Sequence, residues 1–173
     1  MIASDKNLNV SGVSINSPYA STVEFVNALM PGKPIAALDV GTKTIGLAIS
    51  DTNLMIATPL ETLQRTKFKN DMDKLLSLES YWDLAGYVIG LPMNMDGSEG
   101  PRCQSVRAFA RNMCQYISLP ITFWDERLST VSAEKYLLET GASRKKRAAK
   151  KDNFASSIIL QTALEYFQNK KVL

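Results

Sequence analysis

Apolar residues in the first part of the chain follow the periods of β-strands. Residues 35–40 form a short apolar run that ends at the turn-forming Gly41. In residues 45–50 apolar side chains occupy every second position, which predicts a second strand in a hairpin with the first. Three further strands are expected, at about residues 55–63, 84–91 and 121–124.

Helical spacing replaces strand spacing in four other segments. Apolar side chains recur at intervals of three and four residues after Thr66 and after Pro101, a residue favoured in a first helical turn. The predicted helices are residues 66–80, a helix from Pro101 to about Ile117, residues 130–140 and residues 152–169. The order β-β-β-α-β-α-β-α-α predicts an α/β fold, a mixed five-stranded sheet with helices on both faces.

The N-terminal segment has no strand pattern. Residues 1–33 are rich in Ser and Asn and end in a Pro- and Gly-containing stretch typical of a linker. Within them, Ser21 and Glu24 have the spacing of a capping box, so a short helix could follow through Met30. We therefore expect an N-terminal appendage over residues 1–33 and a folded domain over residues 34–173.

The composition is that of a globular protein of about one domain. The chain has 173 residues, of which 45% are apolar and 21% charged, unlike a disordered chain. No apolar run approaches the roughly 18 residues of a membrane-spanning helix. The N-terminus lacks the basic and then apolar segments of a secretory signal. A cytoplasmic protein without membrane association is expected.

Histidine is absent from the whole sequence. This excludes His-based catalytic triads and nearly all zinc sites. Cys103 and Cys114 stand 11 residues apart on one predicted helix, too far to bond to each other, and are expected as free thiols. A catalytic metal would then be a hard cation bound by oxygen ligands.

The positive charge is concentrated in one segment. The formal net charge is +3, but residues 144–151 alone carry six positive charges, so the rest of the chain sums to −3 (+3 minus +6). Such a run is either a solvated surface or a contact for a polyanion.

Acidic residues stand at three places where strands end or helices begin. Asp39 interrupts an apolar strand, Asp125 and Glu126 follow the fifth strand, and Asp152 begins an apolar helix. Their ordinary alternatives are a turn, an ion pair with Arg127 and a helix N-cap. If they converge at one sheet edge, a divalent cation would relieve their repulsion. Two Mg²⁺ ions about 4 Å apart could clamp the oxygens of a phosphodiester.

Asp125 and Glu126 should point to opposite faces if the strand continues through both. Only one can then face Asp39 and Asp152. We expect this to be Asp125, because it lies nearer the regular part of the strand. Glu126 would orient Arg127 or cap the following helix.

Residues 90–100 combine glycines with a proline in a tight loop that could let a sugar-phosphate backbone approach closely; a plain strand-to-helix connection is the alternative. Arg107 and Arg111 lie one helical turn apart beside the apolar stripe. We expect both to form a solvated face.

Four motifs follow one another along the chain. The first motif is the Asp-Val-Gly-Thr-Lys segment of residues 38–51, and the second is the Gly-Leu-Pro and Asp-Gly loop of residues 90–99. The third is Asp-Glu-Arg-Leu-Ser-Thr within residues 124–130. The fourth joins the basic run to residues 152–161. Together these motifs resemble the YqgF/RuvX family of the ribonuclease H-like superfamily, with Ser129 and Ser156 as small departures from the family pattern.

The resemblance implies a ribonuclease H-like fold and a nuclease that acts on the 5′ end of pre-16S rRNA, or a Holliday junction resolvase. It implies metal binding by Asp39, Asp152 and an acid of the pair Asp125 and Glu126, with Mg²⁺ or Mn²⁺ as cofactor. The expected partners are structured RNA, ribosomal particles or branched DNA, and the expected state is a monomer or weak homodimer. The candidate nucleic-acid contacts are Lys43, Asn94, Gly97, Arg127, Arg144, Lys145, Lys146 and Arg147.

Two other classes of function remain open. Residues 39–42 resemble the first phosphate loop of actin-like ATPases, but a core of about 140 residues leaves no room for the second lobe that encloses a nucleotide. The other alternative is a non-catalytic RNA- or ribosome-binding module, against which the three intact acidic motifs argue.

Overall fold

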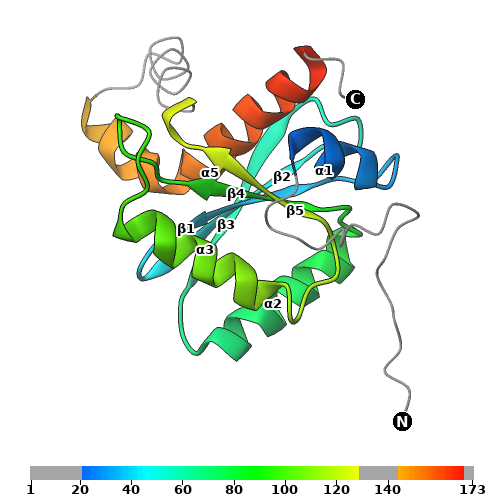
Figure 1. Cartoon of the computed structure of the whole chain (residues 1–173), viewed down its shortest axis with the longest axis horizontal. Helices are drawn as coiled ribbons and strands as arrows, with labels where there is room; N and C mark the ends of the chain where they lie inside the picture. Colours follow the sequence, from blue (N-terminus) through cyan, green and yellow to red (C-terminus); the bar gives the residue numbers. More distant parts are fainter. Residues whose placement is uncertain (1–20, 129–143, 170–173) are drawn as a thin grey trace.

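The computed structural model describes residues 21–128 and 144–169 (Figure 1), with side chains described from Phe154 onward in the second range. The elements are, in chain order, α1 (Thr22–Ala28), β1 (Ala36–Val40), β2 (Thr44–Ser50), β3 (Ala57–Gln64), α2 (Phe68–Trp82), β4 (Tyr87–Leu91), α3 (Pro101–Met113), β5 (Ile121–Asp125) and α5 (Arg144–Asn169). The predicted order of these elements is confirmed. The helix expected at residues 130–140 lies outside the described residues.

The five strands form one mixed sheet in the order β3-β2-β1-β4-β5. Strands β1 and β2 form the predicted antiparallel hairpin, and β3 adds antiparallel to β2. Strands β1, β4 and β5 run parallel to one another. Because parallel strands end on the same side, the residues that follow these three strands meet at one edge of the sheet.

Helices cover both faces of the sheet, as predicted. On one face α2 and α3 pack with side chains such as Met72, Leu75 and Phe109. On the other face α1 and α5 pack around Ala37, Trp124 and other buried residues, and Figure 1 shows α5 lying across this face. Among the described residues no helix has the length and apolarity needed to cross a membrane.

Helix α1 is part of this core. The Ser21 capping box is confirmed: the Glu24 N–H donates to Ser21 Oγ at 3.2 Å, and the Ser21 N–H donates to a Glu24 carboxylate oxygen at 2.8 Å. Phe25 is fully buried and its ring lies 6.0 Å from that of Phe167. Residues 21–33 therefore pack with the sheet domain, whereas residues 1–20 of the expected appendage lie outside the described residues.

Helix α5 begins at Arg144, eight residues before the predicted start at Asp152. The physical reason is local: residues 144–151 are Arg, Lys and Ala, all strong helix formers, and no Gly or Pro separates them from the apolar helix. Asp152 is therefore inside a helix, and its interpretation as an N-cap is wrong. The basic run forms the first turns of the same helix.

Candidate active site

Asp39 lies near the end of β1, on the face of the sheet that α5 covers. It is half-buried and stands opposite Gly46 of β2. A Cβ atom at Gly46 would lie 3.5 Å from both Asp39 Cβ and Ser156 Oγ. Ser156 is a buried residue of α5. Because Gly46 has no side chain, β1, β2 and α5 can approach one another beside the Asp39 carboxylate.

Glu126 lies over the neighbouring strand β4. Its backbone N–H donates to the Leu91 carbonyl at 3.1 Å, which extends the parallel pairing of β4 and β5 by one residue. A Cβ atom at Gly90 would lie only 2.7 Å from Glu126 Oε1 and 2.6 Å from Ile159 Cδ1. The Glu126 carboxyl group therefore occupies space that any other residue at position 90 would fill.

The environment of Glu126 favours its neutral form. The pKa of Glu126 is raised to about 7. Burial is the largest cause, and the negative charge of Asp39 is the next. The positive charge of Arg102 acts in the opposite direction. The pair of Asp39 and Glu126 thus has the burial and like-charge repulsion that a bound cation would relieve.

Asp125 points elsewhere and is held by Arg127. The Arg127 Nε lies 3.0 Å from each carboxylate oxygen, Nη2 lies 2.6 Å from Oδ2, and the Arg127 backbone N–H donates to Oδ1 at 3.0 Å. This guanidinium lowers the pKa of Asp125. The expectation that Asp125 faces Asp39 is therefore corrected, because Glu126 is the acid on that side.

Strand parity gives the reason. Trp124 belongs to the core under α5, whereas Phe123 packs against the core on the opposite face. Side chains alternate along a strand, so Glu126 follows Trp124 to the α5 side and Asp125 follows Phe123. The sequence contains this signal, but only if Trp124 is known to face α5.

Asp152 lies one helical turn before Ser156 on α5, the residue that adjoins Gly46. Its backbone position thus brings the third predicted acid toward Asp39. Among the side chains that the structure describes, no three acids or other metal-binding groups come together. Among the described side chains, Asp39 and Glu126 are the two predicted acids on the face of the sheet that α5 covers. The side chains of Arg144, Lys145, Lys146 and Arg147 lie outside it.

The loop between β4 and α3 is built by two of the predicted contact residues. The Asn94 side chain donates to Ser98 Oγ at 2.9 Å, and the Gly97 N–H donates to the Asn94 carbonyl at 2.9 Å. Gly97 has φ of +87°, a conformation that favours glycine. Both residues therefore shape the loop. Lys43 is exposed in the β1–β2 turn, near the carboxyl end of β1.

Two arginines of α3 differ from expectation. Arg107 is not a solvated residue: its Nε donates to Glu99 at 2.7 Å, and its guanidinium lies 4.8 Å from the centre of the Phe123 ring. Arg102 was missed from the sequence, yet it is exposed at the start of α3 and its charge acts on Glu126. The sequence feature that could have identified Arg102 is its position directly after the glycine-containing loop.

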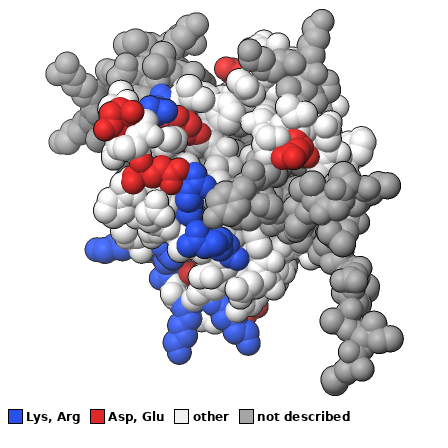
Figure 2. Space-filling view, in the orientation of Figure 1, with Lys and Arg blue, Asp and Glu red and all other residues white. Residues whose placement is uncertain are grey.

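Figure 2 shows the side of the molecule on which the loop before α3, α3 itself and α2 are visible, in the orientation of Figure 1. Asp and Glu gather around the loop that precedes α3, and Lys and Arg extend from there over α3 toward α2. The acidic and basic groups of this face are thus arranged side by side, with the basic surface leading away from the loop.

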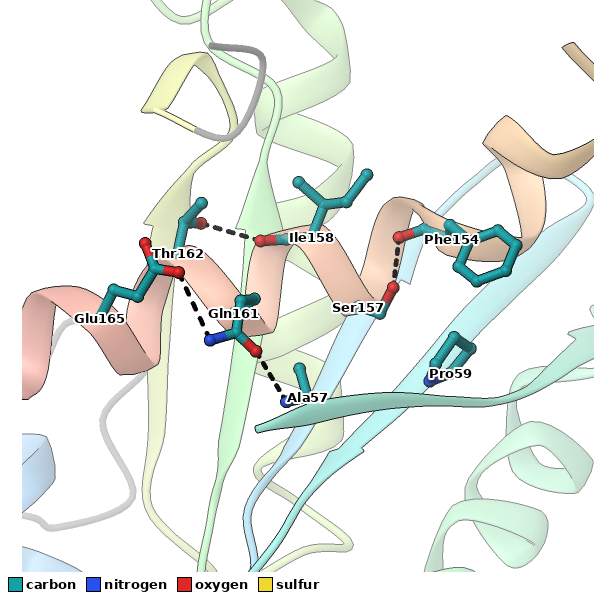
Figure 3. Close-up of a pocket in the computed structure, with 8 residues that line it drawn as sticks. All are labelled: Ala57, Pro59, Phe154, Ser157, Ile158, Gln161, Thr162 and Glu165. Carbon is teal, nitrogen blue, oxygen red and sulfur yellow. Dashed lines mark hydrogen bonds between the residues drawn. The ribbon is translucent and has the colours of Figure 1, made fainter. Parts of the chain in front are cut away.

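A pocket lies between α5 and β3 (Figure 3). Gln161 Oε1 accepts a hydrogen bond from the Ala57 N–H at 2.9 Å, and Gln161 Nε2 lies 3.4 Å from Glu165 Oε1. The first of these bonds joins α5 to the edge strand β3, and the second lies within α5. The pocket is lined by Ala57, Pro59, Phe154, Ser157, Ile158, Gln161, Thr162 and Glu165. It contains none of the predicted catalytic acids and is not the candidate active site.

Comparison with known proteins identifies relatives of this chain. The chain is 55% identical over 146 residues to a protein of Ruegeria pomeroyi named "Putative pre-16S rRNA nuclease", covering 84% of this chain and 95% of that protein. It is 52% identical over 142 residues to a protein of Rhizobium meliloti with the same name, covering 82% and 86%.

Among solved structures, "T. thermophilus RuvC in complex with Holliday junction substrate" matches with a TM-score of 0.53 at 8% identity, over 81% of this chain and 97% of that one. This likeness supports the ribonuclease H-like fold. The sequence model of the RuvX family, described as "Holliday junction resolvase", matches residues 33–166. The chain therefore belongs to the RuvX family of nucleases.

Proposed function

We propose that this protein is a metal-dependent nuclease that hydrolyses phosphodiester bonds at the 5′ end of pre-16S rRNA. The observation that carries the proposal is the pairing of Asp39 and Glu126 at one sheet edge, with the Glu126 pKa raised by burial and by the Asp39 charge. Like charges held this close are costly for a fold unless they serve a cation.

The donor set suits a hard divalent cation. Asp39 and Glu126 would hold it, with Asp152 as the third ligand from α5. All three groups are carboxylates, the ligands that Mg²⁺ and Mn²⁺ prefer. When bound, one or two such ions would neutralise charge on the phosphate and lower the pKa of water.

The protein's own residues prepare the site. Gly90 leaves the space in which the Glu126 carboxyl group sits. The Glu126 pKa of about 7 applies without metal, and a bound cation would favour the ionised carboxylate that holds it. Arg127 neutralises Asp125 and so keeps a third negative charge from acting fully on the pair. Arg102 and Lys43 are exposed cations at this edge that can contact phosphate groups.

The RNA assignment rests on the relatives, both of which carry a pre-16S rRNA name. The basic first turns of α5 would bind the flanking polyanion. The partners would be pre-16S rRNA in ribosomal particles, the location the cytoplasm, and the active form a monomer or weak homodimer.

A second candidate is cleavage of four-way DNA junctions. The description of the family model and the RuvC-like fold favour it. Paired cuts in a junction need two active sites, so this function would require a dimer. A non-catalytic RNA-binding role is the third candidate function.

The test is cleavage of matched substrates by the purified full chain. A pre-16S RNA with its 5′ extension, a mature-ended RNA and a synthetic four-way junction are each incubated with Mg²⁺, Mn²⁺ or EDTA. We expect metal-dependent cleavage of the extended RNA alone, and none by Asp39→Asn. Cleavage of the junction alone would support the resolvase. Binding without cleavage of any substrate would support the non-catalytic module.

A further inference from the structure

Met95 is the most exposed large apolar side chain in the described part of the chain, with 88% of its surface accessible. It lies in the loop between β4 and α3, which projects from the sheet edge in Figure 1. A single exposed apolar residue is ordinary on a protein surface. The position of Met95 is unusual because of how the loop is held.

The loop around Met95 is fixed by its own hydrogen bonds. The Asn94 N–H donates to the Ser98 carbonyl at 2.9 Å, and the Ser98 N–H and hydroxyl donate to Asp96 Oδ1 at 2.9 Å and 2.6 Å. The bond from Gly97 to Asn94 closes the turn. Met95 therefore stands at the tip of an ordered turn, and the backbone of this turn loses little conformational entropy on binding.

The same loop is tied to the catalytic acids. Arg127 Nη1 lies 3.4 Å from the Met95 carbonyl while its other nitrogens bind Asp125, the residue before Glu126. At the base of the loop, the Leu91 carbonyl accepts the Glu126 N–H. The ion pair of Glu99 with Arg107 holds the other end on α3. The loop that carries Met95 thus adjoins the strand ends at which Asp39 and Glu126 lie.

We propose that Met95 stacks against an unpaired nucleobase of the substrate strand next to the cleaved phosphate. This rests on the proposed function, which places a nucleic acid at the acidic edge. The face of a base is the apolar part of a polyanion, and an apolar thioether attracts it while exposed cations such as Arg102 suit the phosphates. Methionine is among the apolar side chains that insert between bases.

The experiment uses the full chain and a pre-16S RNA carrying 2-aminopurine at successive positions around the cleavage site, with binding measured in EDTA. The wild type should change the fluorescence at one position. Met95→Ala should lose that change and weaken binding by about two- to ten-fold, the range of a contact between a thioether and an aromatic ring. Met95→Gln should lose most of it, because length is kept but the apolar surface is not. Met55→Ala, at a residue 51% exposed in the β2–β3 turn, is the matched control.

The outcomes separate this inference from the proposed function. Wild-type fluorescence and affinity in Met95→Ala, with an unchanged melting temperature, would overturn the stacking contact even if the RNA is cleaved. A wild type that binds the RNA without cleaving it, and whose signal depends on Met95, would support the contact and contradict the nuclease. Equal losses of fluorescence change and affinity in Met95→Ala and Met55→Ala would also contradict the stacking contact, because the loss would not be specific to Met95.

Discussion

Asp39 and Glu126 share one face of the sheet although their strands, β1 and β5, are separated by β4. The strand between them contributes Gly90, whose missing side chain leaves the space that the Glu126 carboxyl group occupies. The two acids thus interact across a strand, and burial together with the charge of Asp39 raises the pKa of Glu126. The predictions below follow from this arrangement.

Asp39→Asn should abolish metal-dependent cleavage and preserve the fold. The amide keeps the size of the side chain but removes the charge that a divalent cation needs, and it also removes repulsion with Glu126. Without metal, the melting temperature should stay level or rise slightly. Asp73→Asn, at an exposed residue of α2, is the control and should cleave like the wild type. Near-wild-type turnover in Asp39→Asn would refute the metal site.

Glu126→Gln should be inactive, whereas Asp125→Asn should mainly lower thermal stability. The reason is that Glu126 faces Asp39, while Asp125 anchors Arg127 through an ion pair. Turnover and melting temperature of both variants, measured in the same buffer, check this pair of expectations. If Asp125→Asn lost all turnover and Glu126→Gln kept it, the assignment by strand parity would fail.

The metal-free wild type should lose stability relative to Glu126→Gln as the pH rises. The pKa of Glu126 is about 7 in the folded chain against an ordinary value of 4.5, so the folded state favours the protonated form. That stabilisation is present below about pH 4.5 and is lost as the pH rises through about 7. After allowance for partial exposure the effect is on the order of 2 kcal/mol. Unfolding in urea at about pH 5 and pH 8 measures it, and a pH-independent difference would contradict it.

Gly90→Ala should reduce both stability and activity. The added Cβ would lie 2.6 Å from Ile159 Cδ1 and 2.7 Å from Glu126 Oε1, so the end of the Ile159 side chain and the carboxyl group must both move. Overpacking of this kind costs about 1–3 kcal/mol. Gly100→Ala is the matched control, because its Cβ would meet neighbours only at 3.4 Å or more. Equal melting temperatures and turnover for the two variants would show that the space at position 90 is not needed.

Alanine at Arg144, Lys145, Lys146 and Arg147 should weaken RNA binding without removing cleavage at saturating RNA. Alanine keeps the helix, so the change tests charge alone. Each lost phosphate contact should reduce the slope of log affinity against log salt by about 0.7 to 0.9. Fluorescence anisotropy over a salt series gives this slope. An unchanged slope would identify the basic run as a solvated surface.

Much of the fold could be predicted because strand and helix periods are local properties. The hairpin of β1 and β2, the parallel strands β4 and β5 and the helices on both faces all follow from apolar spacing. The start of α5 was predicted eight residues too late, because the basic run was interpreted as a charged surface segment although Arg, Lys and Ala favour a helix. The capped helix α1 was predicted, but its burial was not, since Phe25 contacts Phe167, far along the chain.

The site was predicted less completely for the same reason. Motif residues identified Asp39 and the adjacent acids, but which acid faces inward depends on the packing of Trp124 against α5. The partners of Arg107 come from a loop and a different strand, Glu99 and Phe123, which no helical spacing reveals. Arg102 acts on Glu126 across the sheet edge, a relationship that exists only once β4 and β5 are paired.

The alternation of side chains along β5 makes this end of the molecule sensitive to chain length. Asp125 forms an ion pair with Arg127, which contacts the loop before α3, and Glu126 interacts with Asp39. Inserting or deleting one residue between Ile121 and Asp125 would exchange these two roles and turn Trp124 away from α5, whereas a change of two residues would keep both. In the evolution of this protein, gaps in β5 should therefore be tolerated only in pairs, while many substitutions at its surface positions remain acceptable.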